Sequence, residues 1–370
     1  MRSNSVMGFI FSNFHEEAIP ELTFKRTMGS VPFGGKYRLI DFPLSNMVNS
    51  DIAKIGVATK SNYTSLMNHL GSGKMWNLSR RRGGLVLLPP FAENGSFNTR
   101  IEMIYALRSF LEHSTEEYVL ICDCDQIYNI SYKNMIKQHI ESGADITIAY
   151  KSGVLPDKLH EPVIMKINNI NRVTEILINP TVHGECNYAL SSFLINRNLL
   201  LRLVCDCISK NQVDFKRDIL QRNTQVLKIN GYRFDGFLSI ITSVKSYFDA
   251  NMALMNADIR RELFTMDRPV FTKIRDDMPS KYGLSSVVKN SLVAQGCVIE
   301  GEVRNSILFK GVHIHKNVRI ENCVIMQDTQ VYEDSRLSYV ICDKDVTVRS
   351  DRTVSGYSTY PVFIGKSSVV

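Results

Sequence analysis

Residues 311–326, with the sequence GVHIHKNVRIENCVIM, determine the fold of the carboxyl-terminal part of this 370-residue chain. Apolar side chains recur there in steps of six, at Val312, Val318 and Val324 and again at Ile314, Ile320 and Met326. Gly311 and Asn317 precede the first two valines, and a six-residue apolar step with Gly or Asn at the corners is typical of a parallel β-helix. One coil cannot bury its apolar face alone, so the coils stack and share a core.

The same spacing extends to both sides of this stretch, from Leu292 to Val298 and from Val340 to Val346. Val303 and Leu337 depart from the strict repeat, and a set of antiparallel hairpins is the alternative. We therefore predict a β-helix domain over residues 287–370.

The preceding part of the chain alternates short apolar strands with amphipathic helices, which is the pattern of an α/β domain. The predicted strands are Val6–Phe11, Ile52–Thr59, Gly84–Leu88, Tyr118–Cys122 and Asp145–Tyr150. The predicted helices are Ser61–Leu70, Arg100–His113, Ser131–Ser142 and Ser243–Asp258. Because runs such as YVLIC at 118–122 are apolar throughout, we expect a mostly parallel, mixed sheet covered on both faces. This domain is predicted over residues 1–259, with a linker of weak periodicity over 260–286.

The composition excludes several classes of function. The net charge is +7, but the basic residues are dispersed apart from Arg80, Arg81 and Arg82, whereas a nucleic-acid protein clusters them with aromatic residues. No nucleic-acid partner is therefore expected, and anionic small molecules such as sugar phosphates account for the charge equally well. No apolar run approaches the roughly 18 residues that span a membrane, so no membrane partner is expected. The eight scattered cysteines indicate buried thiols in a reducing cytoplasm.

Several ordered motifs carry a resemblance to a known family. Residues 30–46 read SVPFGGKYRLIDFPLSN, and they are followed by IGVAT at 55–59, HLGSGKMWNL at 69–78 and GGLVLLPP at 83–90. Together with the β-helix, these motifs strongly resemble bacterial glucose-1-phosphate adenylyltransferase, also called ADP-glucose pyrophosphorylase. The resemblance implies a Rossmann-like nucleotidyltransferase domain followed by a left-handed parallel β-helix.

The resemblance also implies a reaction, in which glucose 1-phosphate attacks the α-phosphate of ATP to give ADP-glucose and pyrophosphate. Such a reaction needs a glycine-rich loop for the triphosphate, carboxylates that hold Mg²⁺, and a lysine that binds the sugar phosphate.

The glycine-rich loop is missing from this chain. The G-G-x-G-x-R-L pattern of the family falls on residues 12–19, SNFHEEAI, where Asn13, Phe14, Glu16 and Ala18 occupy altered positions. Phe14 would fill space that a phosphate needs, and Ala18 replaces a basic residue. Glu16 and the neighbouring Glu17 would repel a triphosphate by about 1–4 kcal/mol each. The alternative is that this loop binds ATP by other means.

Three further ligand-binding segments are altered. The K-P pair of the family falls on Met28 and Gly29, and its G-T-A-D-A segment falls on TRIEM at 99–103, without a glycine. The F-x-E-K-P segment falls on ILINP at 176–180, so that Asn179 replaces the lysine and a charge-assisted hydrogen bond is lost.

The metal site implied by the resemblance is half present. Asp125, in CDQIY at 124–128, matches the first metal-holding Asp and follows a strand, where ligands gather in open α/β sheets. The second metal-holding Asp falls on Ile240, which cannot coordinate Mg²⁺. Asp235 lies five residues away and, along a strand, on the other face, although a shifted alignment would rescue it. We therefore expect no metal, and we expect His15, His69 and His113 each to stand alone.

A group of cations is retained. Lys25 and Arg26 stand where the family has K-R, and Arg38 follows thirteen residues after Lys25. These positions resemble the allosteric site of the family, which binds phosphorylated sugars, and convergent cations suit such an anion. Solvated surface charges or ion pairs between subunits are the alternative.

This pattern of losses resembles the GlgD-type, catalytically defective regulatory subunit of the family. It implies a partner, the catalytic ADP-glucose pyrophosphorylase subunit, in a heterotetramer of glycogen biosynthesis, together with a sugar-phosphate effector. No cofactor is required in this interpretation. An active glucose-1-phosphate adenylyltransferase that uses Mg²⁺ is the first alternative. A β-helix acyltransferase using His313 or His315 is the second.

Overall fold

The computed structural model describes residues 5–80, 83–89, 98–156, 158–182 and 184–370. Arg81, Arg82 and Pro90, which belong to stretches discussed above, lie outside these residues. None of the helices in the described ranges is both long and apolar enough to cross a lipid bilayer.

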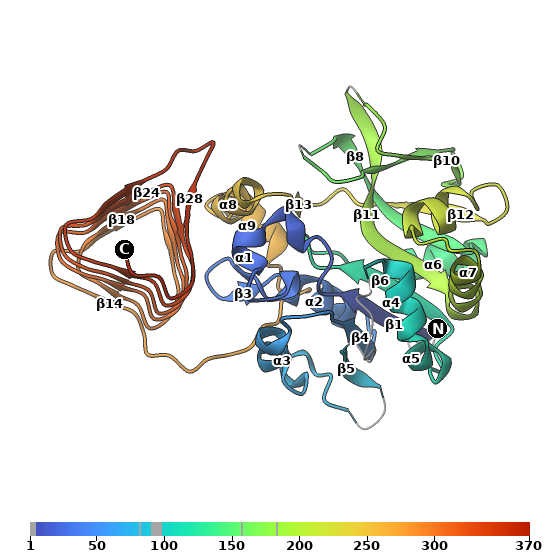
Figure 1. The fold of residues 1–370 in the computed structure, drawn as a ribbon, viewed down its shortest axis with the longest axis horizontal. Coiled ribbons are helices and arrows are strands. Elements are labelled where there is room, and N and C mark those ends of the chain that lie inside the picture. Colours follow the sequence, from blue (N-terminus) through green and yellow to red (C-terminus); the bar gives the residue numbers. More distant parts are fainter. Residues whose placement is uncertain (1–4, 81–82, 90–97, 157, 183) are drawn as a thin grey trace.

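The amino-terminal domain is built on a mixed nine-stranded sheet (Figure 1). Its strands are β1 (Val6–Phe11), β4 (Lys54–Ala58), β5 (Gly84–Leu88), β6 (Tyr118–Asp123), β8 (Ile146–Val154), β9 (Val163–Ile167), β10 (Val173–Ile178), β11 (Glu185–Asn196) and β12 (Ile229–Arg233). The order β6-β1-β4-β5 is parallel, whereas β11 runs antiparallel to β6, β8 and β9. The predicted α/β class is therefore confirmed.

Helices cover this sheet. They are α1 (Pro20–Thr23), α2 (Asp41–Asn49), α3 (Thr64–Leu70), α4 (Arg100–Ala106), α5 (Arg108–Glu112), α6 (Lys133–Ser142), α7 (Arg197–Ser209), α8 (Val244–Ala253) and α9 (Ala257–Leu263). The helix predicted over Arg100–His113 is interrupted at Leu107. The helix predicted over Ser243–Asp258 is also divided, because α8 ends at Ala253 and α9 begins at Ala257. The second interruption has a local cause, because the Asn256 side chain accepts a hydrogen bond from the Asp258 N–H and so caps a new helix, α9.

The carboxyl-terminal domain is a triangular left-handed β-helix, as the resemblance implied, with three parallel five-stranded sheets (Figure 1). The first sheet contains β14 (Lys281–Tyr282), β17 (Val298–Ile299), β20 (His313–Ile314), β23 (Gln330–Val331) and β26 (Thr347–Val348). The second contains β15 (Val287–Lys289), β18 (Glu302–Arg304), β21 (Arg319–Glu321), β24 (Arg336–Ser338) and β27 (Thr353–Ser355). The third contains β16 (Leu292–Val293), β19 (Ile307–Leu308), β22 (Val324–Ile325), β25 (Val340–Cys342) and β28 (Val362–Ile364).

The third sheet is apolar on both faces, and this joins the two domains. One column of side chains faces the solenoid core: Val293, Leu308, Ile325, Cys342 and Ile364. The next column joins the core of the α/β domain: Leu292, Ile307, Val324, Ile341 and Phe363. Figure 1 shows β28 on the side of the triangle that faces α8. Burial on both faces explains why these strands carry consecutive apolar residues instead of an alternating pattern.

The connection between the domains runs from the end of α9 at Leu263 to the start of β14 at Lys281, within the range predicted as a linker. It is attached at both ends. Phe271 donates its N–H to Ser45 Oγ at 2.9 Å on the α/β side. Arg275 donates two hydrogen bonds of 2.9 Å to Asp328 on the β-helix side.

The shared core predicts a specific loss of stability. Ile307 is fully buried, so Ile307→Ala should lower the free energy of unfolding by about 2–5 kcal/mol. Urea denaturation followed by far-ultraviolet circular dichroism measures this loss. The exposed Ile274 is the matched control, and Ile274→Ala should change stability by less than about 0.5 kcal/mol. Equal effects of the two substitutions would contradict the two-sided burial of this sheet.

Candidate functional site

We use the term front site for the loop Ser12–Ala18, which follows β1, together with the residues around Asp123 and Asp125 after β6. The loop begins where Ser12 bonds the neighbouring strand, with its N–H and its hydroxyl both donating to the Ala58 carbonyl, at 3.1 and 2.8 Å. Because β1 and β6 are parallel neighbours, the ends of both strands meet at the same edge of the sheet.

The loop is held together by its own polar side chains. Asn13 donates from Nδ2 to Glu16 Oε1 at 2.7 Å and accepts the Lys60 N–H at 2.8 Å. Glu16 Oε1 also accepts the N–H of Met28, which is itself fully buried, at 3.3 Å. Burial raises the pKa of Glu16 to about 7, although these hydrogen bonds favour its charged form. The altered positions Asn13, Glu16 and Met28 therefore form one internal network.

Phe14 lies against the end of the sheet. Its ring packs edge-on against Phe11 with a centroid separation of 5.0 Å, and the Lys60 amino group lies 4.4 Å from its centroid. Phe14 thus occupies volume beside the strand ends with a side chain that offers no hydrogen bond to a phosphate. Ala18, in the short helical turn that follows, contributes no charge.

Four ionisable side chains meet in the front site. Arg100 donates to Asp123 Oδ2 at 2.5 Å. His15 Nε2 lies 3.2 Å from the same oxygen and 3.9 Å from Asp125 Oδ2. Asp123 is 4% exposed and Asp125 is also 4% exposed, so both carboxylates rely on the protein for neutralisation.

The electrostatics follow from burial and from these partners. Burial opposes ionisation of Asp123, but the Arg100 guanidinium and the His15 ring together outweigh it and lower the pKa of that carboxyl group. Asp125 lacks such a close cation, so burial raises its pKa. Burial disfavours the charged form of His15, yet the Asp125 and Asp123 carboxylates together raise the pKa of its ring.

Local structure places each of these groups. His15 has a left-handed backbone with φ of 67°, which turns its ring toward the strand ends. Arg100 is the first residue of α4, whose start is fixed by a capping box between Thr99 and Glu102. The Arg100 guanidinium lies within 6 Å of four aromatic ring centroids, those of Phe11, Phe14, Phe193 and Phe215.

Ile240 lies directly beside Asp125. It belongs to β13 (Ser239–Ile240), which pairs with β7 (Gln126–Ile127) so that Ile240 faces Gln126, and the Ile241 N–H donates to the Asp125 carbonyl at 2.8 Å. The Ile240 side chain is buried in the apolar core. Asp235 is exposed and pairs with Arg233. Of the two carboxylates that the resemblance implies for Mg²⁺, the front site therefore retains Asp125 alone. The residues at these two positions do not fit the Mg²⁺ site that ATP would need.

Asn179 forms no hydrogen bond with the loop Ser12–Ala18 or with Asp125 among the described residues. It follows β10 in an exposed turn with φ of 53°, and its N–H donates to the Pro162 carbonyl at 2.8 Å.

Lys216 supplies a cation that is influenced by the carboxylates of the front site. Burial and the nearby Arg100 lower the pKa of Lys216, while Asp123 and Asp125 act to raise it.

A second group of charges lies between the two domains. We call its three basic residues, Arg26, Arg38 and Lys344, together with the Arg26 partner Asp343, the interdomain cation cluster. Arg26 donates to Asp343 Oδ2 at 2.7 Å, and both side chains are nearly inaccessible. Arg38 donates from Nη1 to the carbonyl and hydroxyl oxygens of Ser65. Burial, followed by repulsion from Arg38 and Arg26, lowers the pKa of Lys344 to about 7. Lys25 is exposed just after α1.

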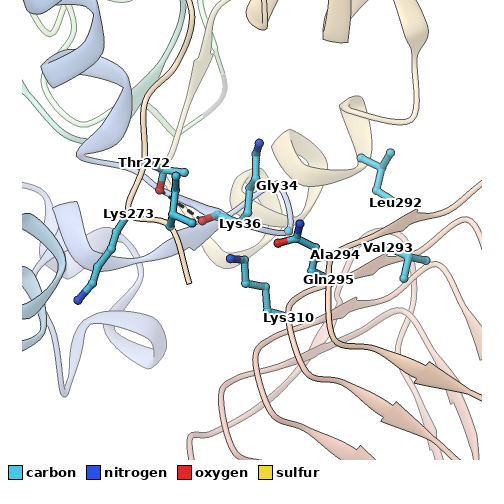
Figure 2. Close-up of a pocket in the computed structure, with 11 residues that line it drawn as sticks. Gly34, Lys36, Thr272, Lys273, Leu292, Val293, Ala294, Gln295 and Lys310 are labelled. Carbon is cyan, nitrogen blue, oxygen red and sulfur yellow. Dashed lines mark hydrogen bonds between the residues drawn. The ribbon is translucent and has the colours of Figure 1, made fainter. Parts of the chain in front are cut away.

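An interdomain pocket of about 490 Å³ opens between the domains and the linker (Figure 2). It is lined by Gly34–Lys36, Thr272–Ile274, Leu292–Gln295 and Lys310. Figure 2 shows Lys310 extending from the β-helix toward the turn that carries Lys36, whereas Lys273 points away. Lys310 donates to the Arg275 carbonyl at 3.0 Å, which ties this wall to the linker.

Comparison with known proteins identifies the family. Residues 19–255 match the family described as nucleotidyl transferase, and residues 278–359 match the GlmU-like, C-terminal hexapeptide family. The chain is 33% identical to the glycogen biosynthesis protein GlgD of Bacillus subtilis, over all of this chain and 98% of that protein. It is 35% identical to a glucose-1-phosphate adenylyltransferase of Halalkalibacterium halodurans, over 84% of this chain and 83% of that protein.

The chain belongs to the glucose-1-phosphate adenylyltransferase family. A relative from Clostridium perfringens with the same name is 31% identical over 90% of this chain and 87% of its own length. The resemblance stated from the motifs is thereby confirmed.

Within this adenylyltransferase framework, the structure groups the predicted residues into two places. Asn13, Phe14, Glu16, Ala18, Met28, Asp125 and Ile240 gather around the front site, whereas Asn179 lies apart. Arg26 and Arg38 meet between the domains, and Lys25 stays exposed.

The sequence reasoning missed His15, Asp123, Arg100, Lys216 and Lys344. The pair Asp123 and Asp125, two residues apart at a strand end, was the available indication of a carboxylate site. Two of the histidines expected to stand alone do not: His15 contacts Asp123, and His69 lies 2.6 Å from Asp41 Oδ1. Lys344 comes from the β-helix, more than 300 residues from Arg38, so no local pattern could indicate it.

The raised pKa of Glu16 predicts a dependence of stability on pH. The unfolded chain ionises this group near 4.5, but the folded chain holds the proton until about 7. The folded state therefore binds more protons in this window, and the free energy of unfolding falls as the pH rises through it. Glu16→Gln keeps the acceptor oxygen but has no proton to lose in this range. Because Glu16 is partly exposed, we expect the fall in the free energy of unfolding to become smaller by only roughly 1 kcal/mol.

Urea unfolding midpoints measured at about pH 5 and about pH 8, on either side of that window, provide the test. Glu17→Gln is the control, because Glu17 is exposed in the same turn and its removal should leave the profile of the wild type. A Glu16→Gln profile parallel to that of the wild type would show that Glu16 ionises normally.

Proposed function

We propose that this chain is a regulatory subunit of ADP-glucose pyrophosphorylase in glycogen biosynthesis, poorly active or inactive by itself. The observation that carries the proposal is the front site, where Phe14 and the Asn13–Glu16 network occupy the loop and Ile240 stands beside Asp125. The loop has no glycine, and Ile240 stands where the second Mg²⁺-holding carboxylate is implied. The names of two relatives, a glycogen biosynthesis protein and a glucose-1-phosphate adenylyltransferase, support the proposed pathway and partner reaction.

In this proposal the chain assembles with a catalytic subunit in the cytoplasm, as a heterotetramer, and shifts the population of its active state. A coupling free energy of about 1–3 kcal/mol would change activity several-fold to about a hundred-fold. The chain itself needs no cofactor. Retention of Asp125 supports one alternative, an active glucose-1-phosphate adenylyltransferase that uses Mg²⁺.

Pyrophosphate release separates the proposal from this alternative. With ATP, glucose 1-phosphate and Mg²⁺, the purified chain should be at least about 10³-fold slower than a catalytic relative, because several transition-state contacts are missing together. Added to its catalytic partner, it should change the response of that partner to substrate or effector. Release by the chain alone at a rate comparable with the catalytic relative would refute the regulatory role.

The proposed effector is an anion of the sugar-phosphate class, held by the interdomain cation cluster. Arg26 and Asp343 connect the two domains directly, and Arg26 Nη1 is buried without a hydrogen-bond partner among the described residues. Burial, together with repulsion from Arg38 and Arg26, lowers the pKa of Lys344 to about 7. A bound anion would relieve that repulsion, so binding should be accompanied by uptake of a proton.

Calorimetric titration with sulfate tests this link, since sulfate itself carries no titratable proton near neutral pH. At about pH 8 in two buffers of different ionisation enthalpy, the wild type should take up close to one proton per anion. Lys344→Met should abolish the uptake, and Lys245→Met should preserve it, because Lys245 lies at a partly exposed position of α8 and pairs with Asp249. Buffer-independent heats in the wild type would place the anion elsewhere.

Equal affinity of Lys25→Ala and wild type for a sugar bisphosphate would show that Lys25 is not part of the site.

A further inference from the structure

The two carboxylates of the front site carry more negative charge than the Arg100 guanidinium can neutralise. Asp123 and Asp125 are both buried, and their side chains lie within reach of one fixed cation, Arg100, and one titratable group, His15. Two adjacent carboxylates in a dry environment require a second positive charge nearby. That charge is a proton, carried by His15 or by Asp125, or a metal ion.

The geometry favours a metal ion. One donor atom each from His15, Asp123 and Asp125 lies within 4.8 Å of the others, with separations of 3.2 and 3.9 Å between His15 Nε2 and the two Oδ2 atoms. Ligands of a tetrahedral zinc site, bound at about 2.0–2.2 Å, lie about 3.3 Å apart. Small rotations of side chains would therefore close the three donors around one ion.

The surroundings also suit a metal site. Asp125 Oδ1 is buried and, within the described ranges, has no hydrogen-bond partner. Arg100 donates to Asp123 Oδ2, the oxygen that also faces His15, and so acts as an outer partner that orients a ligating carboxylate, while Asp123 Oδ1 is buried without a hydrogen-bond partner among the described residues. The His15 side chain is 25% exposed, so an ion could enter from that side.

We propose that His15, Asp123 and Asp125 bind a divalent first-row transition-metal ion of the Zn²⁺ class. An imidazole with two carboxylates is a donor set for such ions, whereas Mg²⁺ prefers oxygen ligands in octahedral geometry. The site differs from the one implied for the catalytic members, since two of its three ligands are new and Ile240 replaces a carboxylate. A bound ion would fix the Ser12–Ala18 loop to the end of β6.

Titration of the chelator-treated chain with Zn²⁺ provides the first test. The wild type should bind one ion at this site, and Mg²⁺ in excess should not displace it. His15→Ala and Asp125→Asn should each weaken binding by more than the about 10- to 100-fold typical of losing an outer partner. His113→Ala, which changes an exposed histidine, should bind as the wild type does.

Co²⁺ absorption provides a second readout that does not depend on stability. The wild type should give visible bands of low-symmetry Co²⁺ with mixed nitrogen and oxygen ligands. His15→Cys should still bind Co²⁺ and add a near-ultraviolet thiolate charge-transfer band, which a purely structural role of His15 would not produce. Zn²⁺ affinity unchanged in His15→Ala, or a Co²⁺ spectrum unaltered in His15→Cys, would overturn the proposal in favour of a proton on His15 or Asp125.

Discussion

Two buried carboxylates at the end of β6 impose the constraint on which the front site depends. Asp123 and Asp125 must be neutralised from within the protein, and the chain does so by placing Arg100 at the start of α4 and His15 in a left-handed turn. The His15 turn belongs to the same loop as Phe14 and Glu16. The loop is thus held by contacts to its own protein, at the place where related enzymes are expected to present a glycine-rich backbone to a nucleotide.

The second feature that shapes the molecule is the sheet of the β-helix that is buried on both faces. Ile307 and Val324 belong to the core of the α/β domain, while their neighbours Leu308 and Ile325 belong to the core of the solenoid. The Arg26–Asp343 ion pair crosses the same boundary. Because the domains share a core, a change at their boundary has a physical route to the α/β domain, which the proposed regulation of a partner subunit would require.

Much of this architecture could be predicted from the sequence, because it rests on local periodicity. The six-residue step of Val312, Val318 and Val324 gave the solenoid, and the apolar run at 118–122 gave the central strand β6. The break between α8 and α9 was missed, since it depends on a single capping residue, Asn256.

The sites were harder to predict than the elements. Asp125 and Ile240 could be related through motif order, and the structure pairs Ile240 with Gln126, the residue after Asp125. His15 and Arg100 could not be assigned, because their roles depend on the tertiary meeting of a loop and a helix start with β6. Lys344 joins Arg38 only after the β-helix has packed against the α/β domain.

The central claim is that the front site cannot seat a nucleotide with magnesium, because its own side chains fill the loop and one carboxylate is replaced by isoleucine. A crystal structure of the chain soaked with ATP and Mg²⁺ tests it most directly. The account predicts an unchanged Ser12–Ala18 loop, with Phe14 against Phe11 and no triphosphate beside Asp125. A triphosphate and Mg²⁺ bound together at Asp125, with the loop opened around them, would contradict it.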